Sequence, residues 1–155
     1  VLGPEPLLLW WGDDRTHDEA LHSELRRLTT DLGAGRIAVL DPRANDPQWS
    51  SRLEEKVGTK LTSALVREAD SSVVSTTTDF KGLEADAVIV SNVHELDREE
   101  LRRTLYVACT RARAHLTVLL SEGLRSHYEE GAAWLGAALV NPTETRSEPL
   151  GSPSD

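Results

Sequence analysis

The sequence contains no methionine and only one cysteine, Cys109. A single cysteine excludes an internal disulfide, which is typical of a reducing compartment and predicts a cytoplasmic location. The missing initiator methionine and the opening VLGPEP, which is typical of a linker, indicate a piece excised from a longer protein.

Long apolar runs and a basic surplus are missing as well. The run PLLLWW is far too short to span a membrane and lacks the basic flank of a signal peptide, so no membrane partner is expected. The formal net charge is -9, whereas nucleic-acid binders usually carry a basic surplus that neutralises phosphates. We therefore expect the chain alone to bind nucleic acid poorly, with any such role coming from a local patch or from another domain.

Familiar nucleotide and metal motifs are also absent. A phosphate-binding loop ends in Gly-Lys-Ser or Gly-Lys-Thr, and none of the lysines, Lys56, Lys60 and Lys81, stands in that pattern. The chain lacks the three-glycine dinucleotide fingerprint, and its histidines lack metal-ligand spacing, so no metal site is predicted. A complete nucleotide triphosphatase site of the phosphate-loop type is thus excluded.

What the sequence does contain is an alternation of apolar runs and helical patterns, in a length of 155 residues that suits one domain. Buried strands are predicted at residues 7–11, 36–42, 73–77, 87–90 and 116–120. Helices are predicted over 16–32 from a Thr16–Glu19 capping box, over 46–57, after Asp97 and over 124–139, with a helical turn or two at 60–67. The strands are continuous apolar runs, which favours an α/β fold with a parallel sheet covered on both faces.

Arginines gather near the end of the helix that Asp97 begins. Arg111 follows Thr110 close to the end of this helix, which also carries Arg102 and Arg103. A guanidinium suits phosphate oxygens because its planar fork donates two parallel hydrogen bonds. The alternative is a solvated helix face on which Arg102 and Arg103 pair with the neighbouring acidic residues.

A second polar segment stands before the strand at 87–90. Lys81 supplies a positive charge, Gly82 a tight turn, and Glu84 a carboxylate that could accept hydrogen bonds from sugar hydroxyls. Lys81 and Gly82 could equally shape the turn without touching a ligand. Ligands of parallel sheets bind at the carboxyl ends of strands, so this segment and the TRAR sequence are candidates for a shared edge.

The order and wording of these segments resemble the final two motifs of superfamily 1 DNA helicases of the UvrD/Rep type. TTTDFKGLEADAVIV is similar to the pattern T-x-H-S-x-K-G-L-E before a strand, and EELRRTLYVACTRA to E-E-x-R-R-x-x-Y-V-A-x-T-R-A. Upstream, IAVLDPRANDPQWSSRLEE resembles the fourth motif through Arg43 and Asn45. Matches to the first two patterns are Thr76, Lys81, Gly82, Leu83, Glu84, Glu99, Glu100, Arg102, Arg103, Tyr106, Val107, Ala108, Thr110, Arg111 and Ala112.

The resemblance implies the second of two RecA-like domains, a three-layer α/β/α unit with a mostly parallel sheet. It would span residues 1–140 without the helical domain that large members insert, and the polar residues 141–155 are predicted to form a disordered tail. ATP and Mg²⁺ would bind only together with an N-terminal RecA-like domain that carries the phosphate loop and the metal-binding carboxylates. The chain alone is expected to bind neither and to hydrolyse no ATP.

The same resemblance implies roles for individual residues. Arg111 would be the arginine finger and Arg43 a second contact to the γ-phosphate, while Glu84 would hold the ribose with Lys81 and Gly82 beside it. An arginine finger stabilises the charge that develops in the transition state and senses whether the γ-phosphate is present. A structural salt bridge is the alternative for Arg111, and a capping or ion-pair role is the alternative for Glu84.

Single-stranded DNA is the second partner that the resemblance implies. Thr76 and Thr78 would contact its sugar-phosphate backbone. Three residues depart from the family pattern: Thr78 replaces a histidine, Asp79 a serine, and Pro42 an aromatic residue that stacks on adenine. The carboxylate of Asp79 would repel phosphate, which puts strand contact by this segment in question.

Three functions follow. The first is the C-terminal motor domain of an ATP-dependent DNA helicase or translocase. The second is a degenerate helicase-like domain that uses its acidic surface to bind a protein partner. The third is a doubly wound enzyme whose arginine-rich edge binds a small phosphorylated substrate, which predicts a deep closed pocket where the first two predict an open half-site.

Overall fold

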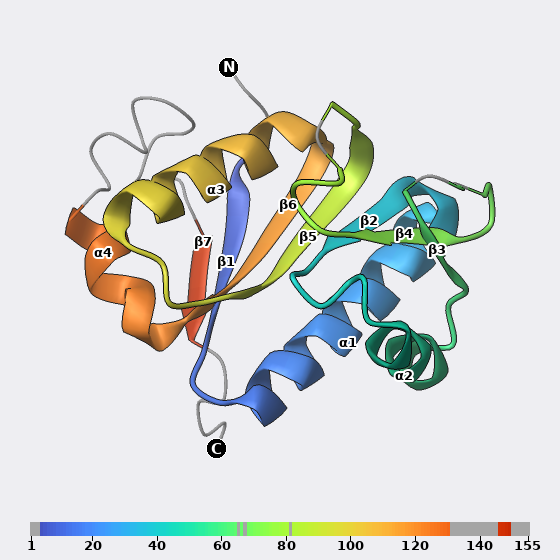
Figure 1. Cartoon of the computed structure of the whole chain (residues 1–155), viewed down its shortest axis with the longest axis horizontal. Coiled ribbons are helices and arrows are strands. Elements are labelled where there is room, and N and C mark those ends of the chain that lie inside the picture. The colour runs from blue at the N-terminus through green and yellow to red at the C-terminus, as the bar shows by residue number, and fades with distance from the viewer. Residues whose placement is uncertain (1–3, 65, 67, 81, 131–145, 150–155) are drawn as a thin grey trace.

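A single parallel sheet of seven strands forms the centre of the computed structural model, which describes residues 4–64, 66, 68–80, 82–130 and 146–149 (Figure 1). The sheet order is β3-β4-β2-β5-β6-β1-β7, and every pair of neighbours is parallel. The strands are β1 (Pro6–Trp11), β2 (Ile37–Leu40), β3 (Leu61–Ser63), β4 (Ser72–Ser75), β5 (Ala85–Val93), β6 (Ala112–Ser121) and β7 (Arg146–Pro149).

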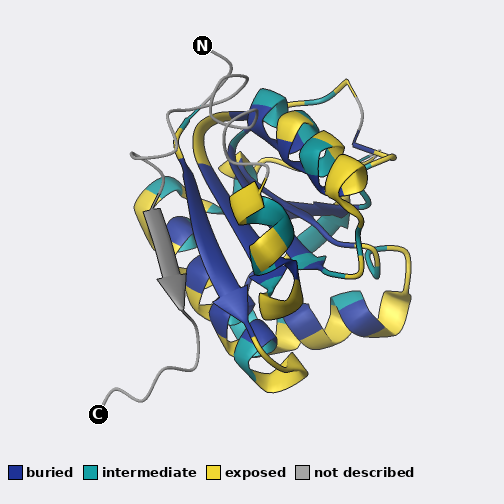
Figure 2. Cartoon of the chain, turned by 90° about the vertical axis from the view of Figure 1, so that its left-hand side faces the viewer, coloured by how far each residue is buried: buried dark blue, intermediate teal, exposed yellow. Residues whose placement is uncertain are grey.

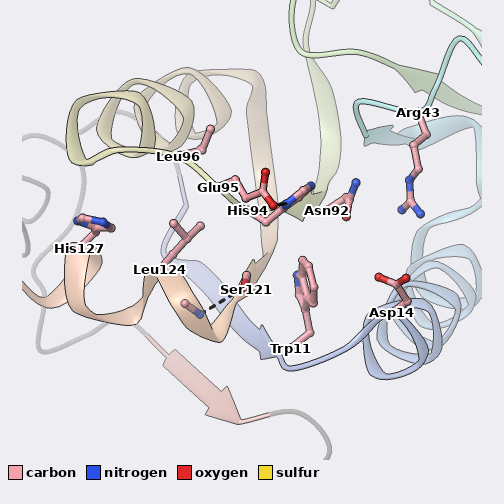
Figure 3. A pocket seen from close by; sticks show the side chains of 11 residues that line it. Trp11, Asp14, Arg43, Asn92, His94, Glu95, Leu96, Ser121, Leu124 and His127 are labelled. Carbon is pink, nitrogen blue, oxygen red and sulfur yellow. Dashed lines mark hydrogen bonds and ion pairs between the residues drawn. The ribbon is translucent and has the colours of Figure 1, made fainter.

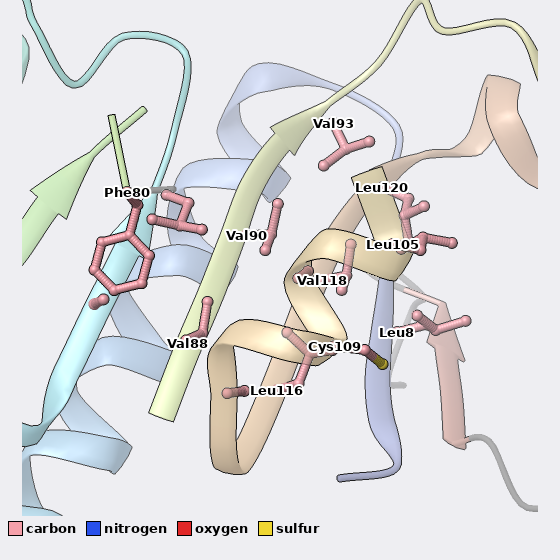
Figure 4. Close-up of a cluster of buried hydrophobic side chains, with 14 of the residues drawn as sticks. Leu8, Phe80, Val88, Val90, Val93, Leu105, Cys109, Leu116, Val118 and Leu120 are labelled. Atoms are coloured by element: carbon pink, nitrogen blue, oxygen red, sulfur yellow. The ribbon is translucent and has the colours of Figure 1, made fainter. Parts of the chain in front are cut away.

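Helices cover both faces of this sheet. The helices are α1 (Asp14–Leu32), α2 (Pro47–Val57), α3 (Arg98–Arg111) and α4 (Arg125–Glu130), with short 3-10 turns at Ala34–Arg36 and Glu122–Leu124. One apolar cluster joins α1 and α2 to the sheet, and a second joins α3 to the opposite face (Figure 4). The predicted three-layer α/β/α fold is confirmed.

The strands are apolar because both of their faces are covered. β1, β2 and β4 are buried along their whole length, as Figure 2 shows for the sheet between its helices. β6 differs at its start, where Arg113, Ala114 and His115 are exposed before the buried run from Leu116 begins. The amino end of β6 therefore extends beyond the core and leaves polar side chains open to solvent.

Local signals set the helix ends, with one correction. Asp13, rather than Thr16, caps α1: its carboxylate accepts from the Thr16 N–H, and the Thr16 hydroxyl closes the capping box from the third helical position. The predicted box of Thr16 and Glu19 is wrong because Asp13 offers a cap one turn earlier. Helix α3 begins as predicted, with Asp97 as its cap.

Two further predictions differ from the structure. Residues 61–63 form strand β3 rather than a helical turn, because they pair with β4 and the Leu61 N–H donates to the Glu54 carboxylate. β7 lies within residues 141–155, which were predicted to be disordered because they are polar. It forms a strand there because it pairs with β1. The other residues of 141–155, and the predicted helical residues 131–139, lie outside the described residues.

The connection from β4 to β5 is the unusual part of this fold. It returns the chain from the carboxyl edge of the sheet to the amino edge in residues 76–84, without a helix. Phe80 anchors this connection: its side chain is fully buried in the cluster beneath α3 (Figure 4), and its N–H donates to the Thr76 carbonyl. Glu84 is thereby delivered to the start of β5.

Candidate functional site

Glu84 and Arg111 lie side by side at the amino edge of the sheet. Ala85 begins β5 and Ala112 begins β6, and these two alanines are partners in the parallel pairing of the strands. Glu84 and Arg111 each directly precede one member of that pair. The two residues that the sequence assigned to ribose and γ-phosphate are therefore brought together, although at the amino edge rather than the carboxyl edge.

Arg111 has donor capacity that the domain does not use. The residue is partly buried in the last turn of α3, where the helix dipole favours a positive charge. Its Nε is buried and has no hydrogen-bond partner among the residues that the structure describes. Because buried polar groups are nearly always paired, this guanidinium fits an acceptor supplied from outside the domain.

An ion-pair network surrounds Glu84. The Nη1 of Arg113 donates to Glu84 Oε1 at 3.2 Å, and its Nε donates to Asp86 Oδ1 at 2.9 Å. Arg36 donates from the other side to Asp86 Oδ2 at 2.5 Å. The hydrogen bond from Arg113, followed by that from Arg36, lowers the pKa of the Asp86 carboxyl. These two arginines keep the Asp86 carboxylate ionised and hold it between the strands.

The remaining predicted nucleotide contacts are Gly82 and Lys81. Gly82 has φ of 83°, a left-handed conformation that glycine adopts without strain, so it shapes the turn before Glu84. Open space surrounds the position where a side chain would stand. Lys81 lies outside the described residues.

Arg43 is not part of this site. It follows β2 and lines a cavity at the carboxyl edge together with Asn92 of β5. The nine residues of β5 separate the two edges by roughly 26 Å, at about 3.3 Å per residue. One γ-phosphate cannot contact both Arg43 and Arg111, so the predicted pairing of these two arginines is wrong.

Arg43 is instead part of a buried network. Its Nε and Nη2 donate to both oxygens of Asp41, at 3.0 and 2.9 Å, and its guanidinium lies 5.0 Å from the centre of the Trp49 ring. Burial alone would raise the pKa of the Asp41 carboxyl, but hydrogen bonds from Arg43 and Ser91 outweigh it and lower the pKa. The pair orders the loop after β2.

The carboxyl edge carries a cavity of about 650 Å³, shown in Figure 3. It lies between the ends of strands whose following helices cover opposite faces of the sheet, where ligands of parallel sheets bind. Its lining residues include Trp11 and Asp14 near the end of β1, Arg43 after β2, Asn92 at the end of β5 with His94 and Glu95 after it, and Ser121 at the end of β6 with His127 after it.

The cavity is lined by polar atoms without partners among the described residues. Trp11 Nε1 and His127 Nδ1 are buried and have no hydrogen-bond partner within the described part of the chain. Trp11 as a residue is only 7% exposed, so its N–H depends on a ligand or water for an acceptor. Arg43 adds a cation, but Asp14 and Glu95 add anions. This balance suits an uncharged group rich in acceptors, such as a nucleobase, better than a bare phosphate.

The loop after β5 is held in an unusual backbone conformation beside this cavity. Asn92 and Glu95 have φ of 57° and 54°, which non-glycine residues rarely adopt. The Asn92 N–H donates to Nε2 of the buried His17 at 2.8 Å, and His17 Nδ1 faces Asp18. Burial lowers the pKa of His17, which keeps Nε2 available as an acceptor.

The predicted nucleic-acid contacts, Thr76 and Thr78, follow β4 at the same carboxyl edge. Thr78 is exposed, whereas the Thr76 hydroxyl accepts from the Asp79 N–H at 3.0 Å and so stabilises the turn. Asp79 also lies 3.4 Å from the Asn45 amide. Its exposed carboxylate therefore lies next to Thr78, where it would repel the phosphates of the single-stranded DNA that this segment was predicted to contact.

Sequence reasoning missed Arg113, Asp86, Trp11 and His17. Each depends on a partner or a cavity formed by residues far away in the sequence, which no local pattern reveals. Only Arg113 had a signal, as the second arginine of TRAR. For Arg102 the solvated-face interpretation is confirmed, because its Nη2 donates to Glu99 at 3.0 Å.

Part of the chain is similar to a known protein family. Residues 71–119 match the model of the UvrD-like helicase C-terminal domain. The matched segment is similar to that family; it runs from just before β4 to near the end of β6 and includes both Glu84 and Arg111. No curated protein matches the chain.

Solved structures share the fold of this chain. The C-terminal domain of a possible DNA helicase from Lactobacillus plantarum WCFS1 is 22% identical, with a TM-score of 0.54 over 77% of this chain and 75% of that chain. A chain from the complex of the E. coli DEAD-box protein SrmB with regulator of ribonuclease activity A (RraA) is 16% identical, with a TM-score of 0.53 over 94% and 90%. At these identities the likeness supports the α/β fold alone.

The described residues also bear on metal sites and membrane-spanning helices. They contain no group of three or more His, Cys, Asp or Glu side chains that could hold a metal ion. None of the helices formed by these residues is both long enough and apolar enough to cross a membrane.

Proposed function

We propose that this UvrD-like domain is the C-terminal motor domain of an ATP-dependent DNA helicase or translocase. Arg111 contacts the γ-phosphate and Glu84 the ribose of an ATP molecule that an N-terminal RecA-like domain holds. The observation that carries the proposal is the placement of these two residues before the paired Ala85 and Ala112, with the buried Arg111 Nε lacking a partner in the described structure.

The chemistry assigned to this edge is electrostatic. Phosphoryl transfer spreads negative charge over the γ-phosphate oxygens, and an arginine finger that neutralises it contributes about 10³-fold or more in rate. Arg111 suits this task because it lies in the last turn of a helix and because the planar fork of a guanidinium matches phosphate oxygens. The partner domain supplies Mg²⁺ and the phosphate loop, which this chain lacks.

Nucleic acid is assigned to the opposite, carboxyl edge. The cavity there offers the unpartnered N–H of Trp11 and a ring nitrogen of His127, which suit hydrogen bonds to an unstacked base, and exposed Thr78 lies on the same edge. Helix α3 connects the two regions, since it begins beside the loop after β5 and ends at Arg111. Movement of Arg111 on loss of the γ-phosphate would thus be transmitted directly to the nucleic-acid edge.

The test uses the full-length protein, with turnover of ATP measured in the presence and absence of single-stranded DNA. We expect Arg111→Ala to lower turnover by about 10³-fold while ATP binding changes only a few-fold. Arg111→Lys should remain strongly impaired, because an ammonium lacks the planar fork. Arg102→Ala on the same helix is the matched control and should retain turnover. Undiminished turnover in Arg111→Ala would exclude the finger role.

A protein-binding module is the second candidate function, favoured by the exposed Asp79 at the carboxyl edge and the net charge of -9. The same assay separates the two. A motor requires DNA-stimulated ATP turnover in the unmodified full-length protein, whereas a degenerate module predicts none.

A further inference from the structure

The ion-pair network at the amino edge connects Glu84 to three neighbouring strands. Arg36 directly precedes β2, Asp86 lies in β5 and Arg113 lies in β6, and these strands are adjacent in the sheet. Arg113 uses two different nitrogens: its Nε donates to Asp86 and its Nη1 to Glu84. The guanidinium is planar and rigid, so fixing it on Asp86 also fixes the direction in which it meets Glu84.

Asp86 is the anchor of this network. Its side chain is 22% exposed, less than half the exposure of the Arg113 and Glu84 side chains, which are both 54% exposed. Arg36 and Arg113 each occupy one oxygen of its carboxylate. Arg113 is therefore held by a group that the sheet already positions from two sides.

Glu84 has the opposite character. It precedes β5 in the turn that Gly82 shapes, and its side chain is long and more than half exposed. A carboxylate selects a sugar hydroxyl only if its oxygens are held within a fraction of an ångström, and a mobile glutamate loses this selectivity. The two oxygens of a carboxylate offer about four acceptor sites, so a carboxylate that accepts from an arginine can also accept from a hydroxyl.

We propose that Arg113 is a positioning residue that holds the Glu84 carboxylate toward the ribose and thereby sets the preference for a ribonucleotide. The proposal rests on the proposed function, because it needs Glu84 to contact the sugar. Exposed ion pairs contribute little to stability, so the effect of Arg113 is expected in substrate selection rather than in folding.

The experiment compares steady-state kinetics of the full-length protein with ATP, 2′-deoxyATP and 3′-deoxyATP. Glu84→Gln reports what the carboxylate contributes. Arg113→Ala removes the contact, and Arg113→Lys keeps the positive charge but lacks the fork that bridges two carboxylates. Lys60→Ala is the matched control, since it removes an exposed cation that lies 3.2 Å from Glu68, at the far edge of the sheet.

We expect Arg113→Ala to raise the KM for ATP about tenfold, with kcat within about twofold, because the hydrogen bond from the ribose to the Glu84 carboxylate is lost when Glu84 is no longer held. The preference is the ratio of kcat/KM for ATP to that for the deoxy analogue, 2′ or 3′, that the unmodified protein discriminates against. In Arg113→Ala and Arg113→Lys this ratio should fall to the level of Glu84→Gln. The double variant Glu84→Gln with Arg113→Ala should prefer ATP no less than Glu84→Gln alone, because the two residues act as a unit.

Two results would overturn the proposal and can be told apart. If Glu84→Gln loses the preference but both Arg113 variants keep it, Arg113 does not position Glu84, and the proposed function stands. If Glu84→Gln keeps the preference, the ribose contact itself is wrong, and the role of Arg113 fails with it. A KM increase in Arg113→Ala that is equal for all three nucleotides and restored by lysine would show a charge effect only, which also overturns positioning.

Discussion

Replacement of Phe80 by alanine tests whether the connection between β4 and β5 is held by one side chain. Phe80 is 0% exposed and packs in the cluster beneath α3, while the residues before it, Thr78 and Asp79, are exposed. The chain must cross from one edge of the sheet to the other here without a helix to support it. We therefore expect burial of this ring to provide most of the free energy that holds the connection between β4 and β5 against the sheet.

The magnitude follows from the size of the ring. Truncation of a buried phenylalanine to alanine costs about 3–5 kcal/mol, from lost transfer free energy and from the cavity that remains. We expect about 3 kcal/mol, because a short connection can partly collapse into the space. For a domain of this size, 1 kcal/mol corresponds to about 2–4 °C in Tm, so Tm should fall by roughly 10 °C.

Urea unfolding followed by far-UV circular dichroism measures this loss. The m-value should stay unchanged, which would show that only stability differs. Val66→Ala is the control, since Val66 is 58% exposed and should lie within about 0.5 kcal/mol of the parent. A loss below about 1 kcal/mol for Phe80→Ala would refute the reasoning, because the connection would then be docked by other contacts.

Two further predictions concern the carboxyl edge. Burial lowers the pKa of His17, so its contribution to the free energy of unfolding is complete above about pH 6.5 and declines as the pH falls toward the lowered pKa. The parent protein should therefore lose unfolding free energy between about pH 7.5 and 5.5, and His17→Gln should lose less. Burial also lowers the pKa of His22, which acts in the same direction and stays in both proteins, so an identical pH dependence of the urea midpoints would contradict a role for His17. Trp11→Phe keeps the packing but removes the unpartnered N–H, and it should weaken single-stranded DNA binding by the full-length protein about three- to tenfold in fluorescence anisotropy. Unchanged affinity, with an unchanged Tm, would exclude the cavity as a base site.

Much of the fold could be predicted because its signals are local. β1, β2, β5 and β6 contain continuous apolar runs, β4 contains a β-branched pair, and the starts of α2 and α3 carry a capping aspartate. The misses share a cause. β3 and β7 are short strands that exist only because β4 and β1 offer an edge to pair with, and pairing partners do not show in a short window of sequence.

The candidate site could be predicted only in part, for a reason that Arg43 makes clear. In a parallel sheet, a residue that directly follows a strand lies at the carboxyl edge, and one that directly precedes a strand lies at the amino edge. Glu84 precedes β5 and Arg111 precedes β6, whereas Arg43 follows β2, so Arg43 lies at the opposite edge of the sheet from the other two. A motif gives the order of its residues along the chain. Their position before or after a strand decides which of them meet, and that rule also separates the proposed nucleotide edge from the proposed nucleic-acid edge in this domain.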